Sequence, residues 1–86
     1  MNIHVSNLSQ NTIDDDLKKL FSTFGAVNTA VILRDKWKGR SMGTAMVDML
    51  NPSEAGNAIT ALNNTLLHGK IISVSEVKYS IRDNMN

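Results

Sequence analysis

Polar and apolar residues alternate at the start of the chain, which predicts a half-buried β-strand over residues 2–6. Ile3 and Val5 fall on one face of this strand, and His4 falls on the other. Three later segments alternate in the same way or are rich in β-branched residues, and we also expect them to form strands: residues 27–33, 44–49 and 71–75.

Two segments between these strands carry apolar residues at helical spacing. The first predicted helix spans about residues 13–24, and its apolar stripe consists of Ile13, Leu17, Leu20, Phe21 and Phe24. Thr12 and Asp15 resemble a capping box at the start of this helix, and Gly25 is expected to end it in the left-handed conformation. The Asn-Pro pair at residues 51–52 has the features of a second helix start.

The order of these elements is β-α-β-β-α-β. This order predicts an α+β fold of the ferredoxin-like type, a four-stranded antiparallel sheet with both helices on one face. We expect residues 1–79 to form this single domain and residues 80–86 to form a polar C-terminal tail. The other face of the sheet is then open, and it is the face on which a binding site is expected.

Composition and charge limit the classes of function. The chain of 86 residues contains no cysteine, which argues against a disulfide scaffold and against a thiolate metal site. Its formal net charge is only +1, so a site for a polyanion must be a local patch. No basic start with an apolar run indicates a signal peptide, and no apolar run approaches the roughly 20 residues of a membrane helix. We therefore expect a cytoplasmic protein without membrane contact.

The predicted first and third strands carry two short motifs, IHVSNL at residues 3–8 and MGTAMVDM at residues 42–49. The first resembles the strand-one hexamer, and the second the strand-three octamer, of the RNA recognition motif family. The likeness covers about residues 1–79 and is to the single-domain form found in bacterial RNA-binding proteins. It implies the ferredoxin-like fold and binding of single-stranded RNA on the open face.

The chain departs from this family at the positions that stack on RNA bases. The family presents aromatic rings at the second hexamer position and at the third and fifth octamer positions. Here these positions hold His4, Thr44 and Met46, and Met42 replaces the cation usual at the first octamer position. Stacking contributes about 1–3 kcal/mol per base, so we expect weak RNA binding with low sequence preference.

The open face is predicted to carry aliphatic and thioether groups rather than charge. Its apolar members are Val31, Leu33, Met46 and Ile71. An exposed apolar face of this kind marks contact with another macromolecule, which can be an RNA or a protein. The alternative to RNA binding is therefore protein interaction or self-association through these residues.

The segment at residues 34–40 is predicted to be a loop, and it holds four of the nine basic residues and the only tryptophan. A loop of this composition can combine stacking by Trp37 with neutralisation of phosphates. A solvated loop in which the tryptophan packs on its own lysine stems is the structural alternative. Because no helical or strand pattern assigns Trp37 to the core, we expect it to be exposed.

The candidate RNA-binding residues combine this loop with the open face and with three positions near the predicted last strand. They are His4, Ser6, Val31, Leu33, Arg34, Lys36, Trp37, Lys38, Arg40, Met42, Thr44, Met46, Ser75, Lys78 and Tyr79. No catalytic site, metal site or cofactor is expected. The acidic run at residues 14–16 fits helix capping, and the two histidines, His4 and His68, stand at no metal-ligand spacing.

Overall fold

The computed structural model describes residues 1–78, and its elements follow the predicted order with one short hairpin added. The expected contact at Tyr79 and the expected tail at residues 80–86 lie outside the described residues. The elements are β1 (Asn2–Ser6), α1 (Asp14–Ser22), β2 (Val27–Arg34), β3 (Ser41–Met49), α2 (Pro52–Leu62), β4 (Leu66–Leu67), β5 (Lys70–Ile71) and β6 (Ser73–Val77).

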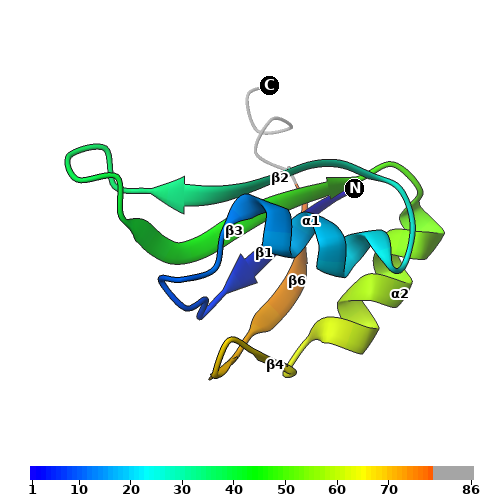
Figure 1. Cartoon of the computed structure of the whole chain (residues 1–86). Helices are drawn as coiled ribbons and strands as arrows, with labels where there is room; N and C mark the ends of the chain where they lie inside the picture. Colours follow the sequence, from blue (N-terminus) through cyan, green and yellow to red (C-terminus); the bar gives the residue numbers. More distant parts are fainter. Residues whose placement is uncertain (79–86) are drawn as a thin grey trace.

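Four strands form one antiparallel sheet in the order β2-β3-β1-β6, and β4 pairs with β5 in a separate hairpin. Both helices lie on the same face of the sheet, and the β2–β3 hairpin extends beyond the other strands (Figure 1). The predicted ferredoxin-like fold is therefore confirmed. The face of the sheet opposite the helices is the open face.

The core lies between the sheet and the two helices, as the alternation along the strands predicts. Ile3, Val5 and Val47 are fully buried on the sheet side, and Leu17 and Phe21 are fully buried on α1. Burial of each side chain of this size contributes about 1.5–3 kcal/mol. Because the inward positions of β1 and β3 are thus fixed by packing, the intervening residues of these strands must point to the open face.

The start of α1 differs from the predicted capping box. The helix begins at Asp14. The backbone N–H of Ile13 donates a hydrogen bond to the carboxylate of Asp16 (2.9 Å), so Asp16 rather than Asp15 is the capping carboxylate. Thr12 is instead buried, with its hydroxyl 2.9 Å from the Nδ1 of His68 on the β4–β5 hairpin. Ile13 is half exposed rather than part of the core, because the helix starts one residue later than the pattern indicated.

The predicted role of Gly25 is also wrong. The helix ends at Ser22, and Gly25 is not among the residues with positive φ. A Cβ at Gly25 would overlap the side chain of Glu54, whose own Cβ would be 2.8 Å away. The glycine therefore allows the chain after α1 to pass close to α2 rather than ending the helix.

The second helix begins as predicted. The side-chain oxygen of Asn51 accepts hydrogen bonds from the backbone N–H groups of Ser53 (2.9 Å) and Glu54 (3.1 Å). Pro52 occupies the first turn, where its missing N–H costs no helical hydrogen bond.

The predicted last strand is divided in two. Ile71 pairs with Leu66 in the β4–β5 hairpin, and the sheet strand β6 begins only at Ser73. Between them, Ile72 is buried and its N–H donates to the carbonyl of Thr65 (2.9 Å). Ile71 therefore does not lie on the open face of the sheet, as had been expected, but is exposed on the hairpin.

The acidic run at the start of α1 has a structural role beyond the helix dipole. Asp14 Oδ1 accepts a hydrogen bond from the backbone N–H of Ile32 on β2 (2.8 Å). Because β2 is an edge strand of the sheet, this carboxylate pairs a backbone donor that would otherwise face outward. The same bond ties α1 to the edge of the sheet.

Candidate nucleic-acid interface

One row of side chains crosses the open face at its centre. The strand register pairs Val31 with Met46, Met46 with His4, and His4 with Ser75. His4 and Met46 are half-buried, whereas Val31 is 48% exposed at the β2 edge. The prediction that His4 and Met46 point away from the core is confirmed.

A second group lies beside this row, toward the β2–β3 loop. Thr44 and Ser6 are half-buried there, and Leu33 and Met42 are exposed. The β2–β3 pairing shifts between Ile32 and Arg34, so β3 has extra residues opposite this part of β2. Met42 and Thr44 lie within this shifted part of β3.

Gly43 lies within the shifted part of β3 and has a φ of 79°. This left-handed conformation is strained for residues with a Cβ, so the glycine is required for the local path of the strand. Its carbonyl accepts the N–H of Leu8 (2.9 Å), which fixes the start of β3 against the end of β1.

The loop between β2 and β3 is held together by Asp35. The Asp35 carboxylate accepts the N–H of Trp37 (2.7 Å), and the Asp35 backbone bonds to both Arg40 (2.8 Å) and Gly39 (2.8 Å). These bonds order the backbone and leave the Trp37 side chain 85% exposed, as predicted. The Nζ of Lys36 lies 5.9 Å from the centroid of the indole ring, within reach of a cation–π contact, but the ring is not covered by a lysine stem as the structural alternative would require.

A hollow of about 530 Å³ lies between this loop and the start of β3. Its lining includes Trp37 and Met42, with Arg34, Asp35 and Lys36 beside them. An indole ring and a thioether offer flat or adaptable apolar surface, and the neighbouring cations can pair with phosphate. We call this feature the Trp37 hollow.

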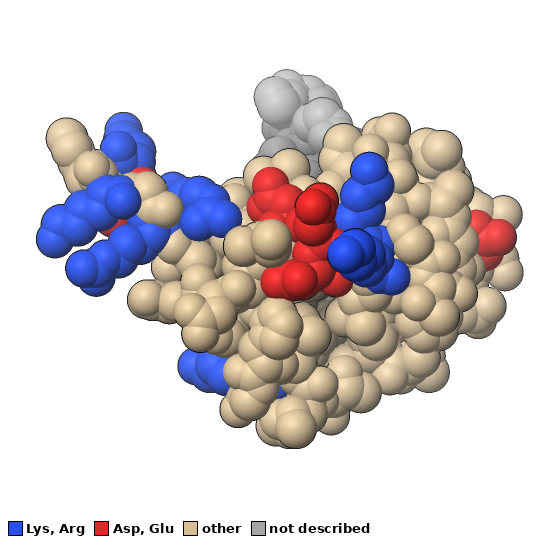
Figure 2. All heavy atoms as spheres, in the orientation of Figure 1, with Lys and Arg blue, Asp and Glu red and all other residues tan. Residues whose placement is uncertain are grey.

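Positive charge is concentrated at this end of the molecule. Figure 2 shows lysine and arginine side chains gathered where the β2–β3 loop projects, whereas acidic side chains lie over helix α1. Residues 34–40 contain four cations and one carboxylate, in a chain with a formal charge of +1. The electrostatic attraction for a polyanion is therefore local, as the composition required.

The opposite end of the open face carries a carboxylate that was not among the candidate residues. Asp48 is paired with Asn2 and Thr29, one row away from the central row. A hydrogen bond from the Asn28 side chain (2.9 Å) lowers the pKa of the Asp48 carboxyl, and the Met1 ammonium 3.4 Å away adds to this effect. Alternation along β3 already placed Asp48 on this face, but the strand register was needed to show its distance from the loop.

The remaining candidates lie at the β6 edge. Ser75 is exposed at the end of the central row, and Lys78 is exposed just after β6. Among the described residues, no three histidine, cysteine or acidic side chains are grouped as a metal site would require. Within residues 1–78, no helix has the length and apolar character needed to cross a membrane.

The four-stranded sheet with both helices on one face defines a ferredoxin-like domain, and its two central strands, β1 and β3, carry the hexamer and octamer motifs. The family model described as RNA recognition motif matches residues 3–73. The chain therefore belongs to the RNA recognition motif family.

Comparison with individual proteins gives the same family. The chain is 41% identical over 73 residues to glycine-rich RNA-binding protein 1 of Mycosarcoma maydis, which covers 85% of this chain but 42% of that relative. Among solved structures, RNA binding protein PG1 has a TM-score of 0.88 at 35% identity, covering 90% of this chain and 93% of that one. A solved SXL-lethal protein/RNA complex has a TM-score of 0.83 at 38% identity, covering 88% and 47%.

The chain thus spans less than half the length of the fungal relative. That relative comes from a eukaryote, so the expected likeness to the bacterial single-domain form is not supported by it.

Proposed function

We propose that this chain binds single-stranded RNA through the open face of the sheet and the basic loop at residues 34–40. The proposal rests on one observation. An exposed tryptophan and four cations lie at one end of the open face, and the central row of that face contains no carboxylate. Binding is weak and of low sequence preference, because stacking rings are replaced on β1 and β3.

On the sheet, the central row provides the base contacts. The His4 imidazole can stack on a base, and Met46 and Val31 offer apolar surface next to it. Further contacts along the same face come from Ser6, Leu33, Met42, Thr44 and Ser75. A base reaches this surface only when it is unpaired and unstacked, so a single strand is the form of RNA that fits.

At the loop, Trp37 stacks on a further base, and its exposure leaves the indole ring accessible. The cations Arg34, Lys36, Lys38 and Arg40 neutralise phosphates around it. Lys78 provides another phosphate contact at the β6 edge, and Tyr79, which lies outside the described residues, belongs to the same proposal as a further RNA contact.

The comparisons support this function without assigning it to these residues. One relative is named as an RNA-binding protein, and one structural neighbour was solved as a complex with RNA. Both are longer than this chain, so the role of the whole protein remains part of the proposal.

We also propose a domain organisation, a non-catalytic role and a location for the protein. Residues 1–79 act as one binding domain followed by a tail at residues 80–86, and the domain binds RNA without catalysing a reaction on it. A cytoplasmic location belongs to the same proposal.

A titration with short random-sequence RNA oligomers, followed by amide chemical shifts at two salt concentrations, tests the function. We expect shifts in the central row and in residues 34–40, with affinity that is micromolar or weaker and falls with salt. Each phosphate contact contributes roughly 0.7 to the slope of log affinity against log salt, so replacing Lys36 and Lys38 by alanine flattens the slope by up to about 1.4. The matched control replaces Lys18 and Lys19 on α1 by alanine.

Shifts confined to the helical face, or no shifts at millimolar RNA, contradict the proposal. Protein interaction or self-association through Val31, Leu33 and Met46 is the other outcome of the same experiment. Sedimentation of the free protein detects a dimer. Loss of that dimer without a change in RNA affinity favours protein interaction over RNA binding. The comparisons do not favour this alternative.

A further inference from the structure

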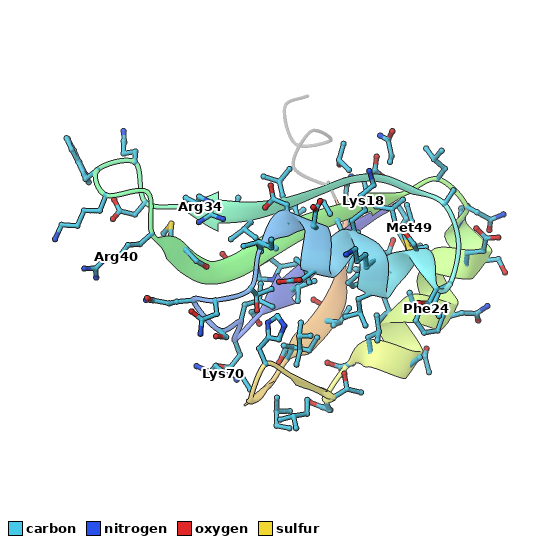
Figure 3. All side chains as sticks on the ribbon, viewed as in Figure 1. Lys18, Phe24, Arg34, Arg40, Met49 and Lys70 are labelled. Atoms are coloured by element: carbon cyan, nitrogen blue, oxygen red, sulfur yellow. The ribbon has the colours of Figure 1, made fainter. Side chains whose placement is uncertain are left out.

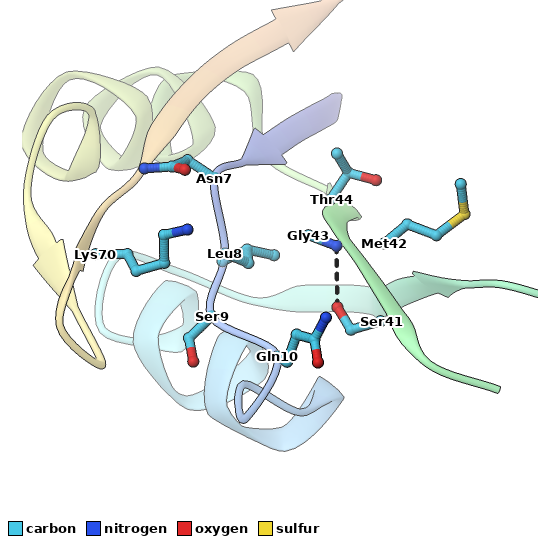
Figure 4. Close-up of a pocket in the computed structure, with 9 residues that line it drawn as sticks. All are labelled: Asn7, Leu8, Ser9, Gln10, Ser41, Met42, Gly43, Thr44 and Lys70. Atoms are coloured by element: carbon cyan, nitrogen blue, oxygen red, sulfur yellow. Dashed lines mark hydrogen bonds between the residues drawn. The ribbon is translucent and has the colours of Figure 1, made fainter. Parts of the chain in front are cut away.

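A second hollow lies at the loop end of the sheet, between the connection that follows β1 and the start of β3 (Figure 4). Its volume is about 460 Å³, and its lining is largely polar. Thr44 of the open face and Met42 of the Trp37 hollow both line it. The second hollow is therefore continuous with the surfaces on which RNA binding is proposed, although it lies beyond the central row.

The far side of this second hollow carries a lysine that the proposed function does not use. Figure 4 shows Lys70 and Met42 on opposite sides of Leu8, and Figure 3 shows Lys70 at the β4–β5 hairpin, below the β2–β3 hairpin that carries Arg34 and Arg40. Lys70 is exposed, and among the described residues no carboxylate lies within ion-pair distance of it. Its charge is thus available to a phosphate that reaches this side.

The position of Lys70 is fixed by a long-range hydrogen bond. The side chain of Asn7 donates to the carbonyl of Ile71 (2.7 Å), which attaches the β4–β5 hairpin to the end of β1. Asn7 has a φ of 61°, a conformation that asparagine tolerates better than most residues. The turn at Asn7 and this bond together hold the preceding residue of the hairpin, Lys70, at the rim of the second hollow.

The opposite wall is equally well defined. Leu8 donates its N–H to Gly43 (2.9 Å), and the N–H of Gly43 donates to the hydroxyl of Ser41 (3.1 Å). The second hollow therefore exists in the free protein, and filling it requires little ordering of the backbone. A pre-formed site avoids part of the entropic cost of binding.

The side chains of the second hollow match one nucleotide. Gln10 is exposed at its edge and offers both a donor and an acceptor, which is what recognition of a base edge requires. The Thr44 hydroxyl can bond to a base or a ribose, and Lys70 can pair with a phosphate. Met42 separates this site from the Trp37 hollow, so nucleotides in the two sites would be close along one strand.

We infer that the second hollow binds an additional nucleotide of the same RNA strand, with its phosphate on Lys70 and its base edge on Gln10. The RNA backbone then runs from the cations of residues 34–40 toward the β4–β5 hairpin, along the loop end of the sheet. This inference rests on the proposed function and adds to it a site that the open face alone does not contain.

RNA oligomers of random sequence, lengthened one nucleotide at a time, test the inference. In the parent protein, one step of lengthening should raise the affinity and shift the amides of residues 7–10 and of Gly43 for the first time. Lys70→Ala should abolish the gain from that step and lower the salt slope of the longer oligomer by roughly 0.7. Gln10→Ala should weaken only the longer oligomer, by about three- to tenfold.

Matched controls are Lys19→Ala on α1 and Asn57→Ala on α2, both exposed positions away from the second hollow. Lys70→Gln keeps the aliphatic stem, and it should show the same loss as Lys70→Ala if charge is the cause. Binding of short oligomers on the sheet with no step at any length overturns the inference and leaves the proposed function intact. Absence of shifts for every oligomer overturns both.

Discussion

Restoring the missing rings on β3 is the perturbation that most clearly separates RNA binding from protein binding. Thr44 and Met46 are half-buried on the open face, and Met46 faces Val31 and His4 on the neighbouring strands. Phenylalanine at both positions would place two rings on this face. Because neither side chain is enclosed by the core, we expect each substitution to change the free energy of unfolding by about 0.5 kcal/mol or less.

The expected gain in RNA affinity follows from base stacking. Each stacked ring contributes at least about 1 kcal/mol, so the double substitution should strengthen binding by about thirtyfold or more. The parent and the variant are compared by fluorescence anisotropy with the same short RNA, and unfolding in urea is measured for both. Ala45→Phe is the matched control, because Ala45 lies between them in sequence but is fully buried on the helical side.

The control should lose about 1–3 kcal/mol of stability through overpacking. If the double substitution destabilises the protein as much as Ala45→Phe does, the assignment of the β3 faces is wrong. If its affinity for RNA is unchanged and a dimer of the parent is lost, the open face binds protein rather than RNA.

Three further predictions concern single residues. Trp37→Ala should leave the stability unchanged, because the ring is 85% exposed, and should weaken RNA binding by about 1–3 kcal/mol in a titration; a variant that binds as the parent does would exclude stacking by the loop. Asn28→Ala should raise the pKa of Asp48, followed by NMR of its carboxyl carbon. The pKa of Asp48 in the folded protein is below the usual value of 3.8, so the stabilisation by this carboxylate is complete above pH 3.8 and is lost as the pH falls through the folded pKa. A pKa of Asp48 that does not move in Asn28→Ala would exclude the Asn28 hydrogen bond as the cause of the shift. Asp14→Ala should cost about 1–2 kcal/mol in urea unfolding by leaving the N–H of Ile32 unpaired, and Asp14→Asn, which keeps an acceptor, should cost less; equal losses would contradict this role.

Local patterns predicted the arrangement of the elements well, because each strand and helix buries a face that its own periodicity reveals. Ile3, Val5 and Val47 are buried where alternation placed them, and Asn51 caps α2 as its sequence indicated. The errors arise where a distant segment decides the local structure. Thr12 is drawn to His68, and Gly25 accommodates Glu54 on the other helix.

The site was predictable to the same extent. Facing residues such as His4 and Met46 follow from alternation, but their alignment in one row depends on the pairing of separate strands. No sequence pattern singles out Lys70, because the bond that positions its hairpin joins Asn7 to Ile71, residues 64 apart in the chain. Sites assembled by such contacts become visible only once the chain is folded.

Intermolecular nuclear Overhauser effects between a bound RNA and the side chains of the protein show directly whether RNA lies on the open face of the sheet. We expect contacts from base protons to the methyl groups of Met46 and Val31 and to the indole ring of Trp37. Leu20, on α1 at the other side of the sheet, serves as the internal reference and should show none. Contacts to Leu20 without contacts to Met46 at saturating RNA would show that RNA binds the helical face instead.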